Sequence, residues 1–504
     1  MPCTTILVGK NASYDGSTII ARNDDSPSGE FTPKRMTVVL PQDQPKQYRS
    51  VISHVQIDLS DLEPMRYTCV PNVLEGEGIW AAAGVNACEV AMTATETITS
   101  NPRVLGADPL VELQPAVGKE GQEGYVPEVC GGIGEEDIVT LVLPYIRSAR
   151  EGVLRLGSLL ERYGTYEMNG IAFADLDEVW WLETVGGHHW IARRVPDDCY
   201  VTMPNQLGID LFDLADAEGE QRAYLCSPDL RAWMAQHHLD RTVRAEGESA
   251  DTFDPRAAFG SASDSDHVYN TPRAWAIQRR LNPHGNVWDG PAADYTPESD
   301  DIPWARKPER LVTIEDVKDV LSLHYQGTPY DCYGASGATR SPYRPIGVNR
   351  TDDLSIIQLR PYAPKGARGV QWITFGSNVF NTVAPFYTTV RSMPAYLAGT
   401  TAAVDTGNFY WASRLVAALA DPHFNACAPH VERYQLKVAA MGHALLAATD
   451  EKAAQAPEDQ FCDTLEAANN RMADDLRAQT DQLLSNVLFT SSMGMRNSFA
   501  RSDG

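Results

Sequence analysis

The order of hydrophobic and polar residues predicts strands in the first part of the chain. CTTILV is rich in residues that favour strands, and NASYDGS supplies Asn, Asp and Gly for a turn. TIIARN then predicts a second strand that runs back beside the first. Residues 3–25 are therefore predicted to form a hairpin. Further strands are expected at MTVVL, YTCV and ACEVAMTATETI, and the last of these alternates around Val90, Met92 and Ala94.

After residue 133 the apolar spacing changes to that of helices. The stretch GEEDIVTLVLPYIRSAREGVLRLGSLLERYG predicts two helices, the first kinked or ended by Pro144. The next stretch, NGIAFADLDEVWWLETVGGHHWIARRV, predicts three strands joined by a turn near Asp175 and a Gly-Gly turn. Helices set between runs of antiparallel strands indicate an α+β fold and not an alternating βαβ fold.

The second half predicts a large domain that ends in a helical tail. Residues 206–266 and 285–310 are polar and loop-rich, so we expect insertions there, with a short helix that has Ser227 as N-cap and Pro228 as its first residue. TIEDVKDVLSLHY predicts another helix, and SIIQLRP and GVQWITFGS predict strands.

We expect one domain over residues 3–432 and a helical extension over 433–504, broken near Pro457. One face of the extension is apolar and is predicted to dock on the core or on a sister subunit, which is compatible with a homo-oligomer. This face carries Phe461, Leu465, Met472, Leu476, Leu483 and Val487.

Composition narrows the classes of partner. The 504 residues carry a net charge of −25, which argues against nucleic acid or an anionic membrane as the main partner. There is no apolar run of about 18 residues and no secretory signal pattern, so we expect a cytoplasmic protein. The nine scattered cysteines form no CxxC pair, and no metal or cofactor is expected. His188 and His189 are expected to point to opposite faces of a strand, which prevents them from sharing a metal ion.

Cys3 is the first candidate for chemistry. If Met1 and Pro2 are removed, the α-amine of Cys3 can act as the general base for its own thiol. Across the hairpin, Arg22 can stabilise the thiolate and Asp25 can orient the α-amine. The competing interpretation of the Arg22–Asp25 segment is a solvated charged turn, and Cys88 on its strand is the alternative nucleophile.

Together these residues resemble the dipeptidase A and secernin family of N-terminal-nucleophile (Ntn) cysteine hydrolases, more distantly related to bile salt hydrolase and penicillin V acylase. The resemblance rests first on CTTILVG and DGSTIIARNDD and extends in order to about residue 388. Its later blocks are GVNACEVAMTATETI, WWLETVGGHHWIARRVPDDCYVTMPNQ, YNTPRAW, GVNRTDDLSIIQLRP and GVQWITFGSNVFNTVAPFYT.

The resemblance implies an αββα sandwich, with two antiparallel sheets between helical layers, and Cys3 as the mature first residue and nucleophile. It also implies that Arg22 and Asp25 assist Cys3, that Asn205 donates to the oxyanion and that Arg273 is a second active-site arginine. Where distant relatives carry another asparagine, this chain has Thr95 and Glu96.

The implied activity is the hydrolysis of dipeptides through an acyl-enzyme, without a cofactor. We expect Glu96, Asp24 or Asp331 to hold the ammonium of a short peptide, and Arg273 or a neighbouring cation to hold its carboxylate. Two alternatives stay open. One is an N-acyl amide hydrolase of the bile-salt or penicillin type. The other is a non-catalytic interaction protein, because Pro2 would block Cys3 if methionine alone were removed.

Overall fold

Two antiparallel sheets form the centre of the computed structural model, which describes residues 3–27, 29–245, 247, 249–334, 341–495 and 497. The seven-stranded sheet has the order β16 (Ala305–Arg306), β12 (Tyr200–Met203), β1 (Thr4–Val8), β2 (Thr18–Asp25), β17 (Thr351–Leu359), β18 (Gly369–Phe375), β19 (Ala384–Tyr387). The six-stranded sheet has the order β14 (Tyr224–Cys226), β11 (His189–Arg194), β10 (Val179–Val185), β9 (Asn169–Ala174), β8 (Ala91–Thr97), β7 (Ala83–Val85). Every neighbouring pair in both sheets is antiparallel.

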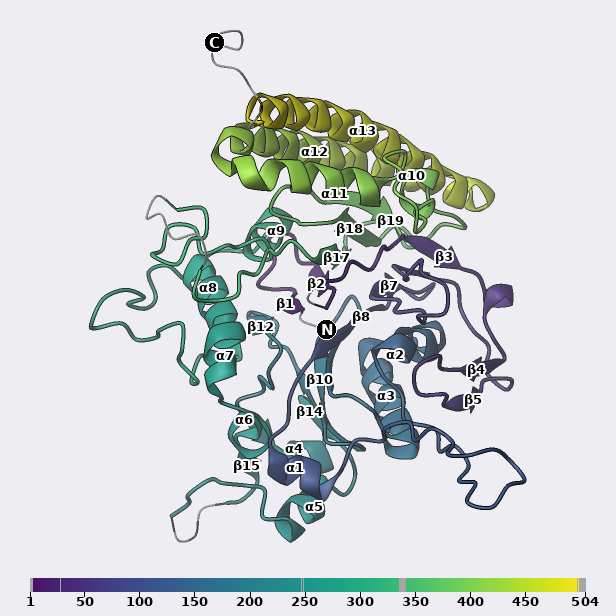
Figure 1. The fold of residues 1–504 in the computed structure, drawn as a ribbon, viewed down its shortest axis with the longest axis vertical. Coiled ribbons are helices and arrows are strands. Elements are labelled where there is room, and N and C mark those ends of the chain that lie inside the picture. The colour runs from purple at the N-terminus through teal and green to yellow at the C-terminus, as the bar shows by residue number, and fades with distance from the viewer. Residues whose placement is uncertain are drawn as a thin grey trace.

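Helices cover the outer faces of the two sheets (Figure 1). The helices α11 (Phe409–Ala420), α12 (Phe424–Ala453) and α13 (Glu458–Met493) pack on β18 and β19. On the other side, α2 (Glu135–Val142) and α3 (Ala149–Tyr163) pack on strands β8 to β11. The sheets contact each other through β2 with β8, β9 and β10. The α+β class predicted from the sequence is confirmed.

Short elements surround this centre. The remaining helices are α1 (Pro102–Ala107), α4 (Leu214–Glu218), α5 (Leu230–Gln236), α6 (Pro255–Phe259), α7 (Asp264–Tyr269), α8 (Thr271–Leu281), α9 (Ile314–Val320) and α10 (Ala395–Ala398). The 3-10 turns are η1 (Pro41–Asp43), η2 (Leu143–Tyr145) and η3 (Asp421–His423). Three strand pairs lie outside the large sheets: β3 (Thr37–Val39) with β6 (Tyr67–Cys69), β4 (Gln47–Arg49) with β5 (Gln56–Asp58), and β13 (Phe212–Asp213) with β15 (Thr252–Phe253).

The opening hairpin forms as predicted. Strand β1 pairs with β2, with Thr4 opposite Asn23 and Val8 opposite Ile19. All residues of both strands are buried, because β2 lies in the middle of its sheet and the second sheet covers one of its faces. Helix α2 ends at Val142, and the chain continues as the η2 turn through Pro144, as the missing N–H of proline requires.

Helix α5 begins later than the sequence predicts. Its N-cap is Asp229, not Ser227. The Ser227 hydroxyl accepts a hydrogen bond from the Trp190 N–H (3.2 Å) and donates to the Trp190 carbonyl (3.3 Å), so it is committed to β11. The helical tail also begins earlier than residue 433, at Phe424, and breaks before Pro457, which is the N-cap of α13. The division into domains at residue 432 stays a prediction.

The prediction that His188 and His189 diverge is wrong. The Nδ1 atoms of both rings contact one carboxylate, that of Asp108, at 2.9 and 2.7 Å. Strict alternation fails here because His188 lies in the turn before β11 begins. Cys88 is likewise not on a strand: it is exposed in the turn between β7 and β8.

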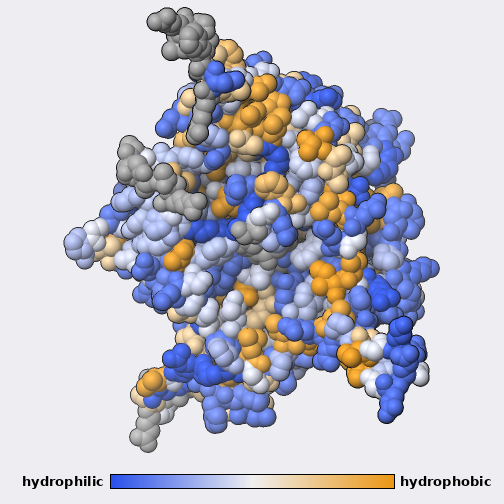
Figure 2. Space-filling model, viewed as in Figure 1, coloured by the Kyte–Doolittle hydropathy of each residue, from blue (hydrophilic) through white to orange (hydrophobic). Residues whose placement is uncertain are grey.

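The surface in Figure 2 is largely hydrophilic, with apolar residues in separate small areas. None of the helices in the described part of the chain combines the length and the apolar character that a membrane crossing needs.

Candidate active site

Cys3 lies at the start of β1, opposite the end of β2. The pairing of Thr4 with Asn23 and the alternation of side chains along β2 place Arg22 and Asp24 on the face of the Cys3 sulfur. Arg22 Nη2 donates to Cys3 Sγ over 2.8 Å, and the thiol lies 3.9 Å from Asp24 Oδ1. Cys3 is completely buried and Arg22 almost so. The predicted proximity of Arg22 to Cys3 is therefore present, and Asp24 lies with them.

The Arg22 guanidinium contacts three side chains, those of Cys3, Asp24 and Glu135. Besides the sulfur, Nη2 contacts Asp24 Oδ1 at 3.0 Å and Glu135 Oε1 at 2.6 Å, while Nη1 donates to the Ala94 carbonyl. Burial alone would lower the pKa of Arg22, but the Cys3 sulfur, Asp24 and Glu135 raise it well above its usual value. A permanent positive charge against the sulfur favours the thiolate, which is the nucleophilic form of cysteine.

Lys34 is a second buried cation at the site, and sequence reasoning did not find it. Its Nζ lies 2.8 Å from Asp24 Oδ2 and donates to the Trp80 carbonyl at 2.8 Å. Burial acts to raise the pKa of Asp24, yet Lys34 and Arg22 hold that pKa below its usual range. Asp24 therefore stays ionised, and its charge is balanced from both sides.

Glu135 was also missed, because it is far from Arg22 in sequence. It begins helix α2, where Gly134 is the N-cap, and its side chain is 3% exposed. Its backbone N–H donates to Glu167 Oε1 at 2.7 Å. Burial and the neighbouring Glu135 raise the pKa of Glu167. The only local signal is the acidic start of the predicted helix, and a helix N-terminus favours such residues on any surface.

Two further aspartates extend the cluster behind Asp24. Burial, with Asp24 nearby, raises the pKa of Asp353 to about 8, although Lys34 opposes this shift. Burial also raises the pKa of Asp352 to about 7, against the effect of Arg414. Both residues belong to β17, which pairs with β2 next to Asp24 and Asp25.

Arg273, on α8, ties the backbone of the nucleophile to two asparagines. Its Nη1 donates to the Cys3 carbonyl and to Thr4 Oγ1 (2.7 Å), and its Nη2 to Asn205 (2.7 Å) and Asn270 (2.8 Å). Its Nε donates to the Tyr269 carbonyl at 2.7 Å. These bonds use all five N–H groups of the guanidinium, so Arg273 has no donor left for a substrate carboxylate.

Asn205 and Asp25 both lie near the nucleophile, with side chains already engaged. Asn205 Nδ2 donates to the Thr97 carbonyl at 2.9 Å. Asp25 accepts from Thr351 Oγ1 at 2.6 Å and from Arg344, and alternation along β2 directs it away from the face of Arg22. The roles of Asn205 at the oxyanion and of Asp25 at the α-amine stay predictions.

Of the other predicted residues, the structure describes the side chain of Asp331 but not those of Thr95 and Glu96. Asp331 is bonded to His324 and to the Tyr333 N–H, in the loop after α9. The side chains of Thr95 and Glu96 lie outside the described residues, as do Met1 and Pro2.

A cavity of about 870 Å³ opens beside the Arg273 network. Asn205, Tyr269 and Asn270, which are partners of Arg273, line one part of it. Much of the remaining wall carries hydroxyl and amide side chains, including Thr97, Thr99, Ser100, Asn101, Ser261, Ser263 and Ser265. A pocket of this size, lined by three partners of the arginine that holds the Cys3 backbone, can receive a small ligand.

Two groups of potential metal ligands occur among the described residues. The ligand atoms of Cys3, Asp24 and Glu135 lie within 4.8 Å of one another, but Arg22 Nη2 contacts all three and takes the place of a cation.

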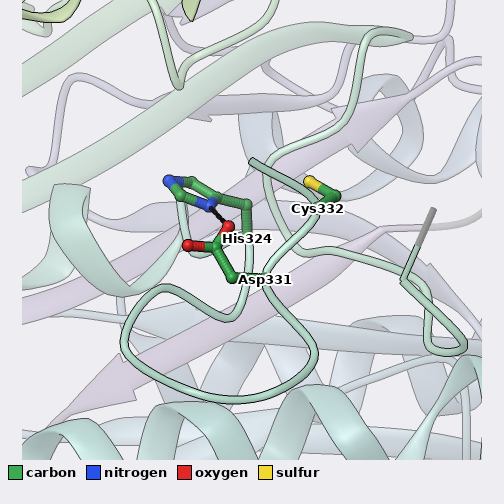
Figure 3. Close-up of side chains that lie close together, drawn as sticks. All are labelled: His324, Asp331 and Cys332. Atoms are coloured by element: carbon green, nitrogen blue, oxygen red, sulfur yellow. Dashed lines mark hydrogen bonds and ion pairs between the residues drawn. The ribbon is translucent and has the colours of Figure 1, made fainter. Parts of the chain in front are cut away.

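The second group is His324, Asp331 and Cys332, shown in Figure 3. His324 Nδ1 lies 2.8 Å from Asp331 Oδ1, an ordinary hydrogen bond. Burial and Asp331 raise the pKa of Cys332 to about 11, which opposes the thiolate that a metal needs.

Comparison with known proteins gives consistent matches along the chain. The family described as Peptidase family C69 matches residues 2–437. The chain is 57% identical over 543 residues to a dipeptidase of Bifidobacterium longum, with 100% of both chains covered. It is 52% identical over 505 residues to a probable dipeptidase A of Streptococcus pyogenes, again with 100% of both covered. It is 43% identical over 490 residues to dipeptidase A of Lactobacillus helveticus, with 96% of each chain covered.

Proposed function

The chain belongs to peptidase family C69, and we propose that it is a cysteine dipeptidase whose nucleophile is the thiol of Cys3. The observation that carries this proposal is the contact of 2.8 Å between Arg22 Nη2 and Cys3 Sγ. Both side chains are buried, so solvent does not weaken this contact. The names of the relatives supply the substrate class, since they are dipeptidases.

The proposal includes removal of Met1 and Pro2, which frees the α-amine of Cys3. The amine takes the thiol proton, and the thiolate attacks the scissile carbonyl to form the carbon–sulfur bond. Arg22 stabilises the thiolate before attack, and Asn205 donates to the oxyanion. The carbon–nitrogen bond then breaks, the leaving amine takes the proton from the α-ammonium, and a thioester remains on Cys3.

The second half of the cycle restores the enzyme. Water attacks the thioester, the α-amine accepts a proton from that water, and the thiolate leaves. Asp25 is assigned to orient the α-amine, and Arg273 to hold the backbone of Cys3 and the amide of Asn205 in position. Glu96 is the assigned carboxylate for the substrate ammonium, and Asp24, the other residue predicted for this role, already pairs with Arg22 and Lys34. No step in this cycle calls for a cofactor.

The proposal also assigns the finer fold, the four-layer αββα sandwich of the Ntn hydrolases. The contacts of the helices α11 to α13 with one sheet and of α2 and α3 with the other support it. The cytoplasmic location and a homo-oligomeric state stay predictions.

The test compares the protein with its Cys3→Ala variant on a panel of dipeptides and N-acyl amides. We expect dipeptide turnover, and a loss of at least about 1000-fold in kcat for Cys3→Ala, because the proposed thioester forms on the Cys3 sulfur. Cys88→Ser is the matched control and should retain the parent rate within about twofold. Substantial turnover by Cys3→Ala would contradict the proposed nucleophile, and activity confined to N-acyl amides would contradict the proposed substrate class.

A further inference from the structure

Arg350 is a cation near the active site without an anionic partner. It is partly buried, directly before β17, and no carboxylate lies within ion-pair distance of it among the residues that the structure describes. Its Nε is buried without a hydrogen-bond acceptor. By contrast, Arg344 is paired with Asp25 and Arg414 with Asp352. A half-buried guanidinium in this condition has lost hydration without gaining a counter-ion.

The contact that Arg350 does make leads to the cavity beside the Arg273 network. Its Nη2 donates to the hydroxyl of Tyr269 at 2.5 Å, and Tyr269 lines the cavity of about 870 Å³. Because the phenol oxygen accepts from Arg350, its own proton is free to be donated elsewhere. Within the described part of the chain, that proton has no acceptor at hydrogen-bond distance.

The position of Tyr269 is fixed by two other arginines. The Cζ atoms of Arg273 and Arg344 lie 5.3 and 5.1 Å from the centre of its ring. Stacking of two cations on one phenol favours a rigid orientation of the ring. Three guanidinium groups, those of Arg273, Arg344 and Arg350, therefore contact the side chain of Tyr269, while Asp266 is the carboxylate in the wall of the same cavity.

Arg350 is connected to the nucleophile by two routes. The first runs through Tyr269 to Arg273, which donates to the Cys3 carbonyl. The second runs along the sheet: the Arg350 carbonyl accepts from the Ser26 N–H at 3.0 Å, and the next residue, Thr351, pairs with Asp25. Both routes end at the strand termini where Cys3, Asp24 and Asp25 meet.

We propose that Arg350 and the Tyr269 hydroxyl form the subsite for the free C-terminal carboxylate of a short peptide substrate. The assignment rests on the proposed peptidase function and deepens it. A carboxylate accepts the N–H donors of a guanidinium and a phenolic O–H at the same time, and such charge-assisted bonds are the stronger kind. Arg273, the carboxylate ligand expected from the sequence, is already saturated, so Arg350 takes over that role.

The experiment compares a neutral dipeptide with its C-terminal amide, which has the same shape and lacks the negative charge. In the parent protein, KM for the amide should exceed KM for the dipeptide by roughly 10- to 100-fold. Arg350→Ala should raise KM for the dipeptide by a similar factor with little change in kcat, and should leave KM for the amide within about twofold. Tyr269→Phe should give a smaller change in the same direction, since only the hydroxyl is removed.

Arg155→Ala is the matched control. Arg155 is also a partly buried arginine over a tyrosine, Tyr145, without a carboxylate ion pair in the described structure, but it belongs to α3. The Arg155→Ala variant should leave KM unchanged for both the dipeptide and its amide. Thermal unfolding of each variant checks folding, and Tyr269→Phe keeps the test valid if Arg350→Ala does not fold.

The outcomes separate the two proposals. If the parent protein cleaves dipeptides and Arg350→Ala changes KM equally for dipeptide and amide, the subsite is wrong while the peptidase function stands. If no dipeptide is cleaved, both are wrong. Two dipeptides that carry either Glu or Gln as the second residue distinguish the C-terminal carboxylate from a side-chain carboxylate. If Arg350→Ala raised KM only for the dipeptide with Glu, the assignment to the C-terminal carboxylate would be overturned.

Discussion

Arg22 is the residue on which the geometry of the candidate active site most depends. One of its nitrogens contacts the Cys3 sulfur and the carboxylates of Asp24 and Glu135, all of them buried. A buried charge is tolerated only when it is paired and hydrogen-bonded. Arg22 therefore has two functions, because it stabilises the thiolate in the proposed mechanism and keeps two buried carboxylates neutralised.

The first prediction concerns removal of this cation. Arg22→Met keeps the approximate length of the side chain but removes the buried positive charge that contacts Asp24 and Glu135, so the free energy of unfolding should fall by about 3–5 kcal/mol. Urea denaturation measures this loss. Arg471→Met is the control, since Arg471 is exposed on α13, and its effect should stay within about 0.5 kcal/mol. A loss below about 1 kcal/mol for Arg22→Met would show that the buried network is not coupled to stability.

The second prediction concerns Asp353, whose folded pKa of about 8 lies above the unfolded value of 3.8. Between these two values the folded protein holds a proton that the unfolded chain has released. The contribution of Asp353 to the free energy of unfolding therefore falls as pH rises through this window, by up to about 1.4 kcal/mol per pH unit. Asp353→Asn removes this contribution.

Urea denaturation of the parent protein and Asp353→Asn at several pH values between 4 and 8 tests this prediction. The stability of the variant relative to the parent should increase steadily with pH. Two parallel stability curves would mean that Asp353 is already ionised in the folded state, despite its burial.

At the scale of elements, α13 is attached to the sheet by a polar contact inside its apolar face. Asn469 accepts from the Tyr387 N–H (2.8 Å) and donates to the Tyr387 carbonyl (2.9 Å), as a neighbouring strand would. Tyr387 ends β19, the edge strand of the seven-stranded sheet. The helix thus satisfies backbone groups that an edge strand otherwise leaves open.

The third prediction follows from this contact. Asn469→Ala leaves two buried backbone groups without partners, and the free energy of unfolding should fall by about 2 kcal/mol or more. Asn470→Ala, one position away on the exposed side of α13, should change it by less than about 0.5 kcal/mol. Equal effects of the two substitutions, measured by urea denaturation, would indicate that the side-chain amide of Asn469 contributes nothing specific.

Those parts of the fold that depend on nearby residues could be predicted from the sequence. The hairpin that brings Arg22 to Cys3 follows from strand-forming residues around a Gly-containing turn, and the end of α2 follows from Pro144. The apolar face of α13 is visible as helical periodicity, and Leu465, Met472, Leu476, Leu483 and Val487 are buried as expected.

Contacts between distant segments could not be predicted in this way. Glu135 on helix α2 reaches Arg22 on strand β2 across 113 residues, and Asp25 meets Arg344 across 319. No periodicity encodes which charged residues of a strand will meet those of a distant helix or loop. The error in the start of α5 has the same origin, because Ser227 has good capping chemistry but is used by the Trp190 backbone instead.

At the scale of the whole molecule, the chain is strongly acidic, and the site combines buried cations with buried carboxylates. The chain has a net charge of −25, while the residues around Cys3 include the buried cations Arg22, Lys34, Arg273 and Arg344. Strand β2 supplies Arg22, helix α8 supplies Arg273, and two loops supply Lys34 and Arg344. A low-dielectric surrounding strengthens the effect of each of these charges on the sulfur.

The central claim is that Cys3 reacts as the first residue of the mature protein, and one measurement tests it most directly. The active protein is titrated with a thiol-alkylating reagent while mass spectrometry follows its N-terminal peptide and dipeptide turnover is recorded. We predict that this peptide begins at Cys3 and that turnover falls in proportion to alkylation of the Cys3 thiol. Full turnover by protein that still carries Met1 or Pro2, or turnover that disappears as Cys88 or another cysteine is alkylated, would contradict the account.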